Sequence, residues 1–467
     1  MAIGVSCCTI IYLYVNHELS FDTYNKKAER IYRITTKINQ PGKDDHFAPS
    51  SPKMAASLKA NFPEIESVVR FKNSKRPISY KGKNFYENDI LYADSSLLDM
   101  FTFPIVSGSS HKALSNPYSI VLTEKAAKKY FGNEAPVGKM LQFSDTINLM
   151  VTAVIKDIPQ NSHFHCEAFL SRSTMNDMNK KSEQWIYNNE ENWFNCDSYS
   201  YLLLKENVDY QKLEPKLNAF LDKQMADIKK EVGMSLNIEL QPILNIHLKS
   251  HLDSELKNEV NGDITYVYIF IGAAILTLLI ACCNFINLST ARSLNRSKEI
   301  GLRKVIGASR SQLIFQFLGE SMLFSIVACL LSFFLVLIIK PVFDSFIGTS
   351  LSLTLDVLAL YFLIIIAIGL LAGLYPALLM SSFAPIQSLK GKISHGLSDI
   401  FFRKGLVIFQ FSIAIILIIG TTLILQQLNF IQNRNIGLNK EQILTLEFGP
   451  GDARKADVLL AELLKNP

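Results

Sequence analysis

The segment "RSKEIGLRKVIGASRSQL", residues 296–313, lies between two long uncharged runs. Residues 264–289, "ITYVYIFIGAAILTLLIACCNFINLS", precede it, and residues 321–339, "SMLFSIVACLLSFFLVLII", follow it. Crossing a hydrocarbon core of about 30 Å takes about 20 apolar helical residues, so each run is long enough to span a membrane. The basic segment is therefore predicted to be a short connection at a membrane surface.

The rest of the chain divides into two populations. Residues 357–388 and 405–433 are also uncharged, whereas residues 18–262 are rich in Lys, Asp, Asn and Ser. The overall values of 49% hydrophobic and 19% charged residues average these two compositions. We expect a multi-pass α-helical membrane protein with a large extracytoplasmic α+β domain. The net charge of +5 is small and its basic residues cluster in two short loops, which argues against nucleic-acid binding.

The N-terminal stretch "MAIGVSCCTIIYLYVNHE" is apolar but lacks the basic region and the cleavage site of a secretory signal. We interpret it as the outer part of an incomplete first span. An uncleaved signal anchor is the alternative, and it gives the same topology.

Lys and Arg in the short loops predict the orientation. Residues 292–310 and 388–404 are basic, and the connection between their flanking spans is nearly neutral, so both basic loops are expected in the cytoplasm. The predicted order is a first transmembrane helix at 1–17, an extracytoplasmic domain at 18–262, transmembrane helices at 263–291, 313–340, 356–382 and 405–428, cytoplasmic segments at 292–312 and 383–404, an outer loop at 341–355, and the start of a second extracytoplasmic domain at 429–467.

Local patterns in the outer domain mix strands with short helices. "YSIVLTEKAAKKYFG", residues 118–132, predicts a strand, an N-cap at Thr123, and a helix that ends at Gly132. "MLQFSDTINLMVTAVIKDIP", residues 140–159, predicts a hairpin. The domain is long enough for its own core, which we expect to form two lobes.

No segment carries a recognisable catalytic or cofactor site. "GNEAPVGKM", residues 132–140, has five residues between its glycines and a Met after its Lys, so it does not fit a phosphate-binding loop. "HFHC", residues 163–166, has zinc-ligand residue types but lacks a second cluster at finger-like spacing. We expect no cofactor, no metal and no enzyme activity. Cys166 and Cys196 form one candidate disulfide if the compartment is oxidising.

The basic segment itself is patterned. On one helix, Arg292, Arg296, Arg303 and Arg310 would fall within about 40° of one another, beside an apolar stripe. Leu302, Val305, Ile306 and Leu313 make up that stripe. These features predict an amphipathic helix, with a kink near Gly307. The alternative is that the charges only orient the protein against anionic lipid, but orientation has no use for Glu299, Ile300 or an apolar stripe.

Three regions together resemble the MacB/FtsX-type family of ABC-transporter permeases. Residues 296–325, "RSKEIGLRKVIGASRSQLIFQFLGESMLFS", and 373–392, "GLYPALLMSSFAPIQSLKGK", resemble the permease region. Residues 92–143, beginning "YADSSLLDMFTFPIVSGS", and 154–164, "VIKDIPQNSHF", are similar to the periplasmic core domain. The chain departs from the complete family pattern at both ends, so we expect it to be a truncated member.

The resemblance implies a permease subunit in the bacterial inner membrane, with its large domain in the periplasm. It also implies that a separate ABC ATPase docks on the cytoplasmic segment and drives export or extraction by mechanotransmission. The implied coupling residues are Arg292, Arg296, Glu299, Ile300, Gly301, Leu302, Arg303, Lys304, Val305 and Gly307.

A weak internal echo links the segments after the first and last spans, at residues 12–36 and 425–448. It predicts that a second permease unit begins at residue 405, so we expect a dimer or pseudo-dimer in the lipid bilayer. A periplasmic adaptor is a further candidate partner. The alternatives to a transporter are a membrane-anchored ligand sensor or assembly factor, and a membrane-bound enzyme.

Overall fold

The computed structural model has two units, which are described separately. The helical unit comprises Met1–Leu19 and Ile264–Ile443, and the outer domain comprises Ser20–Asp263 and Leu444–Pro467. The structure describes residues 1–40, 42–74, 78–85, 90–109, 112–143, 147–180, 192–193, 195–226, 230, 233–253, 255–256, 259–353, 355–382, 397–434 and 453–465.

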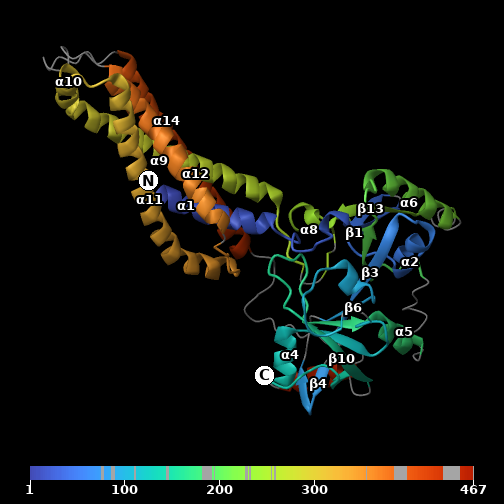
Figure 1. The fold of residues 1–467 in the computed structure, drawn as a ribbon. Coiled ribbons are helices and arrows are strands. Elements are labelled where there is room, and N and C mark those ends of the chain that lie inside the picture. The colour runs from blue at the N-terminus through green and yellow to red at the C-terminus, as the bar shows by residue number, and fades with distance from the viewer. Residues whose placement is uncertain are drawn as a thin grey trace. The chain divides into compact units, whose positions relative to one another are not determined.

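Long helices make up the helical unit (Figure 1). Their bounds are α1 Ala2–Leu19, α9 Ile264–Asn295, α10 Ser297–Val305, α11 Arg310–Ile347, α12 Leu355–Ser382 and α14 Leu397–Asn433. Four helical stretches among the described residues are long and apolar enough to cross a membrane, namely Ala2–Leu19, Ile264–Ala291, Arg310–Ile347 and Lys404–Asn433. The shorter apolar stretch Leu355–Leu370 lies in α12. The predicted fold class, a multi-pass membrane protein with a large outer domain, is confirmed.

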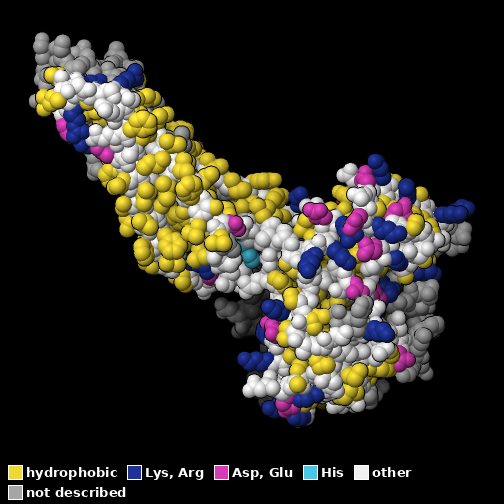
Figure 2. Space-filling view, in the orientation of Figure 1, with side chains coloured by type: hydrophobic (Ala, Val, Ile, Leu, Met, Phe, Trp, Pro, Cys, Tyr) yellow, Lys and Arg dark blue, Asp and Glu magenta, His cyan; other side chains and the backbone are white. Residues whose placement is uncertain are grey.

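The helices share a small buried core while their outer faces stay apolar. Val5 of α1, Cys329 of α11 and Tyr361 of α12 belong to that core. Hydrogen bonds link three of the helices, because Ser6 Oγ lies 3.1 Å from Ser332 Oγ, which lies 3.1 Å from the Tyr361 hydroxyl. In Figure 2 hydrophobic side chains cover much of this unit's visible surface. Such a surface is suited to lipid, where apolar side chains need no protein partner.

The outer domain is built on one mixed sheet. Its strands are β1 Ile31–Gln40, β2 Lys43–Phe47, β3 Ile65–Ser74, β4 Ile78–Tyr80, β5 Lys83–Phe85, β6 Ile90–Ala93, β7 Ile105–Gly108, β8 Ser119–Thr123, β9 Met140–Phe143, β10 Ile147–Ile155, β11 Ala168–Ser171, β12 Tyr199–Leu204 and β13 Ser235–Pro242. Its helices are η1 Ala28–Arg30, α2 Pro52–Asn61, α3 Leu97–Met100, α4 Glu124–Phe131, α5 Arg172–Lys180, α6 Tyr210–Gln224 and α8 Ile243–Lys249. A further helix, α15, covers Ala453–Leu463.

The strand order is β13-β1-β12-β3-β6-β11-β8-β10-β9-β4-β5, with β2 beside β1 and β7 beside β10. Most pairs are antiparallel, whereas β10 with β8 and β11 with β6 run parallel. Figure 1 shows α2 and α6 near β1 and β13 at one end of the domain, and α4 near β4 and β10 at the other. Each end has its own apolar core, and a third core around Phe71 joins them.

Two local predictions for this domain are confirmed. Thr123 caps α4, because its Oγ1 accepts a hydrogen bond from the Ala126 amide at 3.2 Å. The helix ends at Gly132, whose φ of +61° favours glycine. The hairpin also forms, since β9 and β10 pair antiparallel. Residues 132–139, part of the segment that does not fit a phosphate-binding loop, connect α4 to β9.

Candidate coupling site

The basic segment at residues 292–313 folds as parts of three helices. Its first residues complete α9, the central ones form α10, and the last ones open α11. The single amphipathic helix that we predicted over the whole segment is therefore wrong. The four-arginine ridge is wrong with it, because the ridge members lie on different helices or between them: Arg292 on α9, Arg296 before α10, Arg303 within α10, and Arg310 at the start of α11.

A glycine and a capping box account for the break between α10 and α11. Gly307 has a φ of +106°, in the left-handed region where a Cβ is strained. Ser309 then caps α11, since its Oγ accepts from the Gln312 amide at 3.3 Å while Gln312 Oε1 accepts from the Ser309 amide at 2.9 Å. The predicted kink near Gly307 is confirmed in position, and it is a complete break.

Polar side chains join α10 to α11. Arg303 donates to Glu299 at 2.7 Å and to Gln316 at 2.8 Å, and Gln316 donates to Glu320 at 3.3 Å. Arg296 lies 3.2 Å from Glu299 and 3.1 Å from Glu320. The hydrogen bond between Arg296 and Glu299 raises the pKa of the arginine and lowers the pKa of the glutamate. These groups are exposed, so water screens the attraction, and the network orients α10 more than it stabilises the fold.

Ile300 lies on the inner side of α10. It is 4% exposed and packs with Leu313, Phe317 and Ala377. The resemblance implies a coupling role for Ile300, and this burial shows that the side chain packs within its own chain. A side chain already covered by its own chain has no surface left for a partner. Ile300 instead holds α10 against α11 and α12.

The outer side of α10 is apolar and exposed. Leu302 is 52% exposed, Val305 60% and Ile306 78%. Arg303 and Lys304 flank these side chains, and burial together with nearby Arg310 lowers the pKa of Lys304. Three exposed aliphatic side chains beside cations suit a partner surface that offers an apolar groove with an acidic rim.

For the remaining predicted residues, the structure describes only some of the side chains. Gly301 is buried within α10. The backbones of Arg292 and Lys298 belong to helices, but their side chains lie outside the described residues. The second basic loop lies largely outside them too, including Lys390 and Lys392.

The sequence analysis did not predict a close approach of α11 and α12 at two glycines. A Cβ added at Gly373 would lie 2.7 Å from Ser321 Cβ, and one added at Gly369 would overlap Met322. On α11 the residue that faces Gly373 is itself small, since it is the buried Ser321. The signal was present as "GLLAG", residues 369–373, because paired small residues four apart let membrane helices approach closely.

The outer domain brings no metal-ligand cluster together among the described residues. His163 bonds Tyr201 at 2.8 Å, and His165 lies 3.2 Å from the Pro159 carbonyl. No disulfide joins Cys166 to Cys196.

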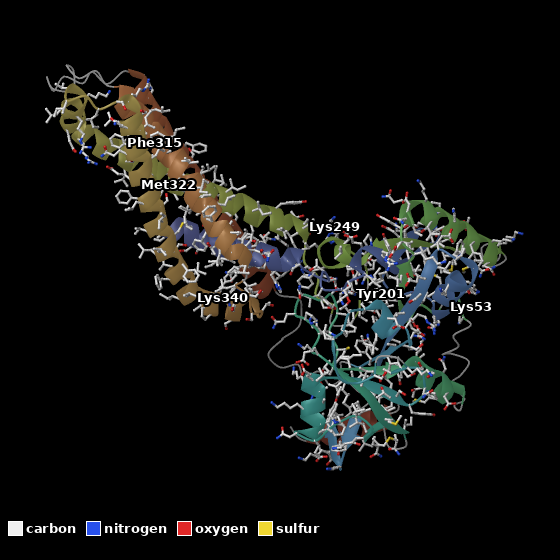
Figure 3. All side chains as sticks on the ribbon, in the orientation of Figure 1. Lys53, Tyr201, Lys249, Phe315, Met322 and Lys340 are labelled. Atoms are coloured by element: carbon white, nitrogen blue, oxygen red, sulfur yellow. The ribbon has the colours of Figure 1, made fainter. Side chains whose placement is uncertain are left out.

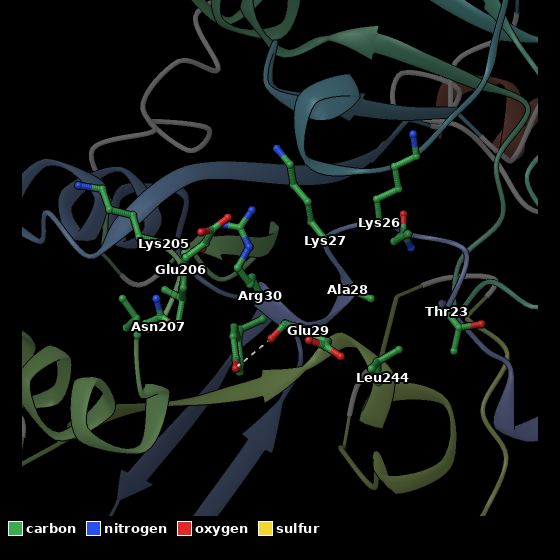
Figure 4. A pocket seen from close by; sticks show the side chains of 14 residues that line it. Thr23, Lys26, Lys27, Ala28, Glu29, Arg30, Lys205, Glu206, Asn207 and Leu244 are labelled. Atoms are coloured by element: carbon green, nitrogen blue, oxygen red, sulfur yellow. Dashed lines mark hydrogen bonds between the residues drawn. The ribbon is translucent and has the colours of Figure 1, made fainter.

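A cavity of about 680 Å³ opens in the outer domain beside η1 (Figure 4). Lys26, Lys27 and Lys205 line it together with Glu29 and Glu206. Charges of both signs therefore line the cavity, and none of the predicted site residues lies there.

Comparisons with known proteins agree with this architecture. Residues 1–220 match the family model of the MacB-like periplasmic core domain, and residues 271–385 match that of the FtsX-like permease C-terminal. A stretch of 117 residues is 32% identical to the macrolide export ATP-binding/permease protein MacB of Bdellovibrio bacteriovorus. That match covers 25% of this chain and 18% of the relative, so the chain spans only a small part of the curated protein that it matches.

Solved structures give weaker likenesses. The periplasmic region of MacB from Actinobacillus actinomycetemcomitans matches with a TM-score of 0.30 and 18% identity, over 44% of this chain and 87% of that one. The extracellular domain of the noncanonic ABC-type transporter YknZ from Gram-positive bacteria matches with a TM-score of 0.32 and 14% identity, over 45% of this chain and 99% of that one. The two family models follow one another along the sequence, outer domain before permease helices, and the chain belongs to the MacB/FtsX-type family of ABC-transporter permeases.

Proposed function

We propose that this chain is the membrane subunit of a transporter in the bacterial inner membrane, driven by a separate ABC ATPase. The ATPase docks on the outer side of α10 in the cytoplasm, and its ATP-driven closure moves the membrane helices and the periplasmic domain. The substrate is exported or extracted by that mechanical movement. Two permease units act together as a dimer or pseudo-dimer, and a periplasmic adaptor is a further partner.

The proposal rests mainly on one observation, that α10 has a buried apolar side and an exposed apolar side. Its outer side presents Leu302, Val305 and Ile306, whereas Ile300 anchors its inner side. A loop that served only to orient the protein would need its charges but would gain nothing from exposed aliphatic side chains. A helix laid in a groove would use such side chains as its anchors.

Polar contacts supply a path from this surface into the membrane. Arg296 and Arg303 connect α10 to Glu320 and Gln316, which lie in the second and third turns of α11. That helix continues to Ile347, with Pro341 near its far end, so one continuous helix can carry a displacement of α10 along most of the span.

Co-purification of the ATPase from cells tests the docking surface. Leu302→Asp or Val305→Asp should reduce recovery of the ATPase by about 30-fold or more, because a charge in a desolvated interface costs about 2 to 5 kcal/mol. The matched control is Leu323→Asn, an exposed apolar position further along α11, which should leave recovery unchanged. Normal recovery with both aspartate variants, in protein that is inserted correctly, would refute docking through this face.

A further inference from the structure

Two of the chain segments that connect the outer domain to the helical unit adjoin α1 and α9 in the sequence. Residues 20–25 follow directly after α1, and residues 259–263 lead directly into α9. Both segments belong to the outer domain, where they lie among buried polar groups. A movement of α1 or α9 that travels along the chain enters the domain through these two segments.

The loop at residues 161–163 contacts the segment that follows α1. The Asn161 side-chain amide donates to the Ser20 carbonyl at 2.9 Å, and the Asp22 amide donates to the Asn161 carbonyl at 2.8 Å. His163 Nδ1 lies 2.9 Å from Asp22 Oδ1, and both side chains are fully buried. Tyr24 and Ser162 add a hydrogen bond of 3.1 Å between their hydroxyls.

The same loop contacts the segment that leads into α9. The Val260 amide donates to the His163 carbonyl at 3.2 Å. The other ring nitrogen of His163 lies 2.8 Å from the hydroxyl of Tyr201, a fully buried residue of β12 that Figure 3 labels among the strands of the outer domain. One loop thus holds both segments and is itself anchored in the sheet.

Two further sets of contacts connect the segments through neighbouring residues of the outer domain. The ring of Phe21 stacks on that of His247 with centroids 3.3 Å apart, and His247 Nδ1 lies 2.6 Å from the Val260 carbonyl. Arg33, on the strand that continues from the first segment, donates twice to Glu259, at 2.7 and 2.8 Å. The guanidinium is fully buried, and Glu259 is 1% exposed. Separating such a pair would strand a charge in a low-dielectric interior.

We propose that residues 161–163 form a clamp that makes the segments after α1 and before α9 one rigid body. A hinge at either segment would have to break the buried contacts of Asp22 or Glu259. Displacements of α1 and α9 therefore reach the outer domain together rather than separately. His163 is the central positioning residue, because its ring and its carbonyl hold different segments.

This inference rests on the proposed transport function, because a clamp matters where helix movement drives the domain. The claim that the two segments form one rigid body does not depend on transport. It is tested on the full chain in lipid nanodiscs by hydrogen exchange with mass spectrometry. A backbone amide that exchanges only when its local structure unfolds reports the stability of that local structure. The informative amides are those of Asp22 and Val260.

His163→Ala should speed exchange at both reporter amides by about a hundredfold or more, since it removes a fully buried side chain that packs against Asp22 and Tyr201 and leaves the Asp22 carboxylate beside a cavity. The matched control is His165→Ala, two residues along, whose Nε2 contacts the Pro159 carbonyl. It should leave both reporters slow. Faster exchange at only one reporter, or at neither, would overturn the clamp.

A second variant guards against general unfolding. If His163→Ala also speeds exchange in β8 and β10, Asn161→Ala decides, because it removes only the side-chain bonds to Ser20. Exchange should again rise at both reporters. A rise confined to residues 20–25 would mean that the segments are held independently and would overturn the proposal.

A transport measurement distinguishes failure of the proposed clamp from failure of the proposed function. With the ATPase partner present, His163→Ala should keep ATP hydrolysis but lower substrate movement per ATP by about tenfold, the size of an ordinary coupling energy. If the wild-type chain shows no ATPase-dependent transport, the proposed function fails while the exchange result still stands. Unchanged transport per ATP in a variant with fast reporters would refute the clamp's role in coupling.

Discussion

Arg296 joins two helices, since its Nη1 lies 3.1 Å from Oε2 of Glu320 in α11 while its Nε lies 3.2 Å from Glu299 in α10. The guanidinium thus sits between the proposed docking helix and the adjoining membrane helix. Both partners are about 40% exposed, so the pair contributes little to folding. We infer that the role of Arg296 is to fix the orientation of α10 relative to α11.

The first prediction separates docking from transmission. Glu320→Gln removes the charge that Arg296 contacts on α11, so we expect thermal stability to change by less than about 1 kcal/mol and ATPase recovery to stay normal. ATP-driven transport should fall about tenfold. The double variant Arg296→Glu with Glu320→Arg should recover part of that loss. Equal transport by wild type and Glu320→Gln, measured in vesicles with matched ATPase content, would contradict the link.

The second prediction contrasts the two sides of α10. Ile300→Ala removes a buried side chain and should destabilise the helical unit by about 2 to 5 kcal/mol. Leu302→Ala truncates an exposed side chain and should change stability by less than about 0.5 kcal/mol, while it lowers ATPase recovery. Thermal unfolding in detergent and co-purification are measured on both variants. Equal stability of the two variants would show that Ile300 is not a packing residue.

Local sequence patterns predicted most of the fold because short-range physics decides those elements. The uncharged runs required membrane helices, and Thr123 with Gly132 marked the ends of α4. The coupling segment was harder. The resemblance implied Ile300 as a coupling residue, whereas the contacts with Leu313 and Phe317 turn its side chain inward. Tertiary packing of this kind is not encoded in a local pattern.

The role of His163 could not be predicted from the sequence either. "HFHC" drew attention as a set of zinc-ligand residue types, but His163 contacts Asp22 and Tyr201, which lie far from it in the sequence. A buried histidine whose ring lies against a carboxylate and a phenol cannot be told from a metal ligand by residue type alone. Only the fold distinguishes the two, because the partners come from separate segments.

The third prediction concerns the reactivity of Cys196. Burial, with Asp197 adjacent, raises the pKa of its thiol to about 12 from an ordinary value of 9.0. Only the thiolate reacts with alkylating agents, so folded protein at pH 8 should label about a thousandfold more slowly at this residue than the unfolded chain does. The unfolded chain releases this proton nearer pH 9, so the contribution to folding is present below that pH and is lost as pH rises toward 12.

Alkylation with and without a reductant distinguishes this from a disulfide. If burial alone protects the thiol, labelling of Cys196 should speed up as pH rises and should not depend on reductant. A disulfide with Cys166 would block labelling at every pH until it is reduced. Rapid labelling of the folded chain at pH 8 would contradict both.

The last prediction concerns the two glycines of α12, which meet neighbours of different stiffness. A Cβ at Gly369 would overlap the thioether sulfur of Met322, which sits at the end of a flexible side chain and can swing away. A Cβ at Gly373 would lie 2.7 Å from Ser321 Cβ, which is fixed to the backbone of α11. Gly373→Ala should therefore force the two helices apart, and Gly369→Ala should be absorbed by a rotamer change. We expect overpacking at Gly373 to cost about 1 to 3 kcal/mol and the cost at Gly369 to be smaller. The double variant Gly373→Ala with Ser321→Gly should recover most of the loss, since it restores the missing space. Thermal unfolding of the four proteins in one detergent measures these differences, and an equal loss at both glycines would show that the helices do not approach most closely at Ser321.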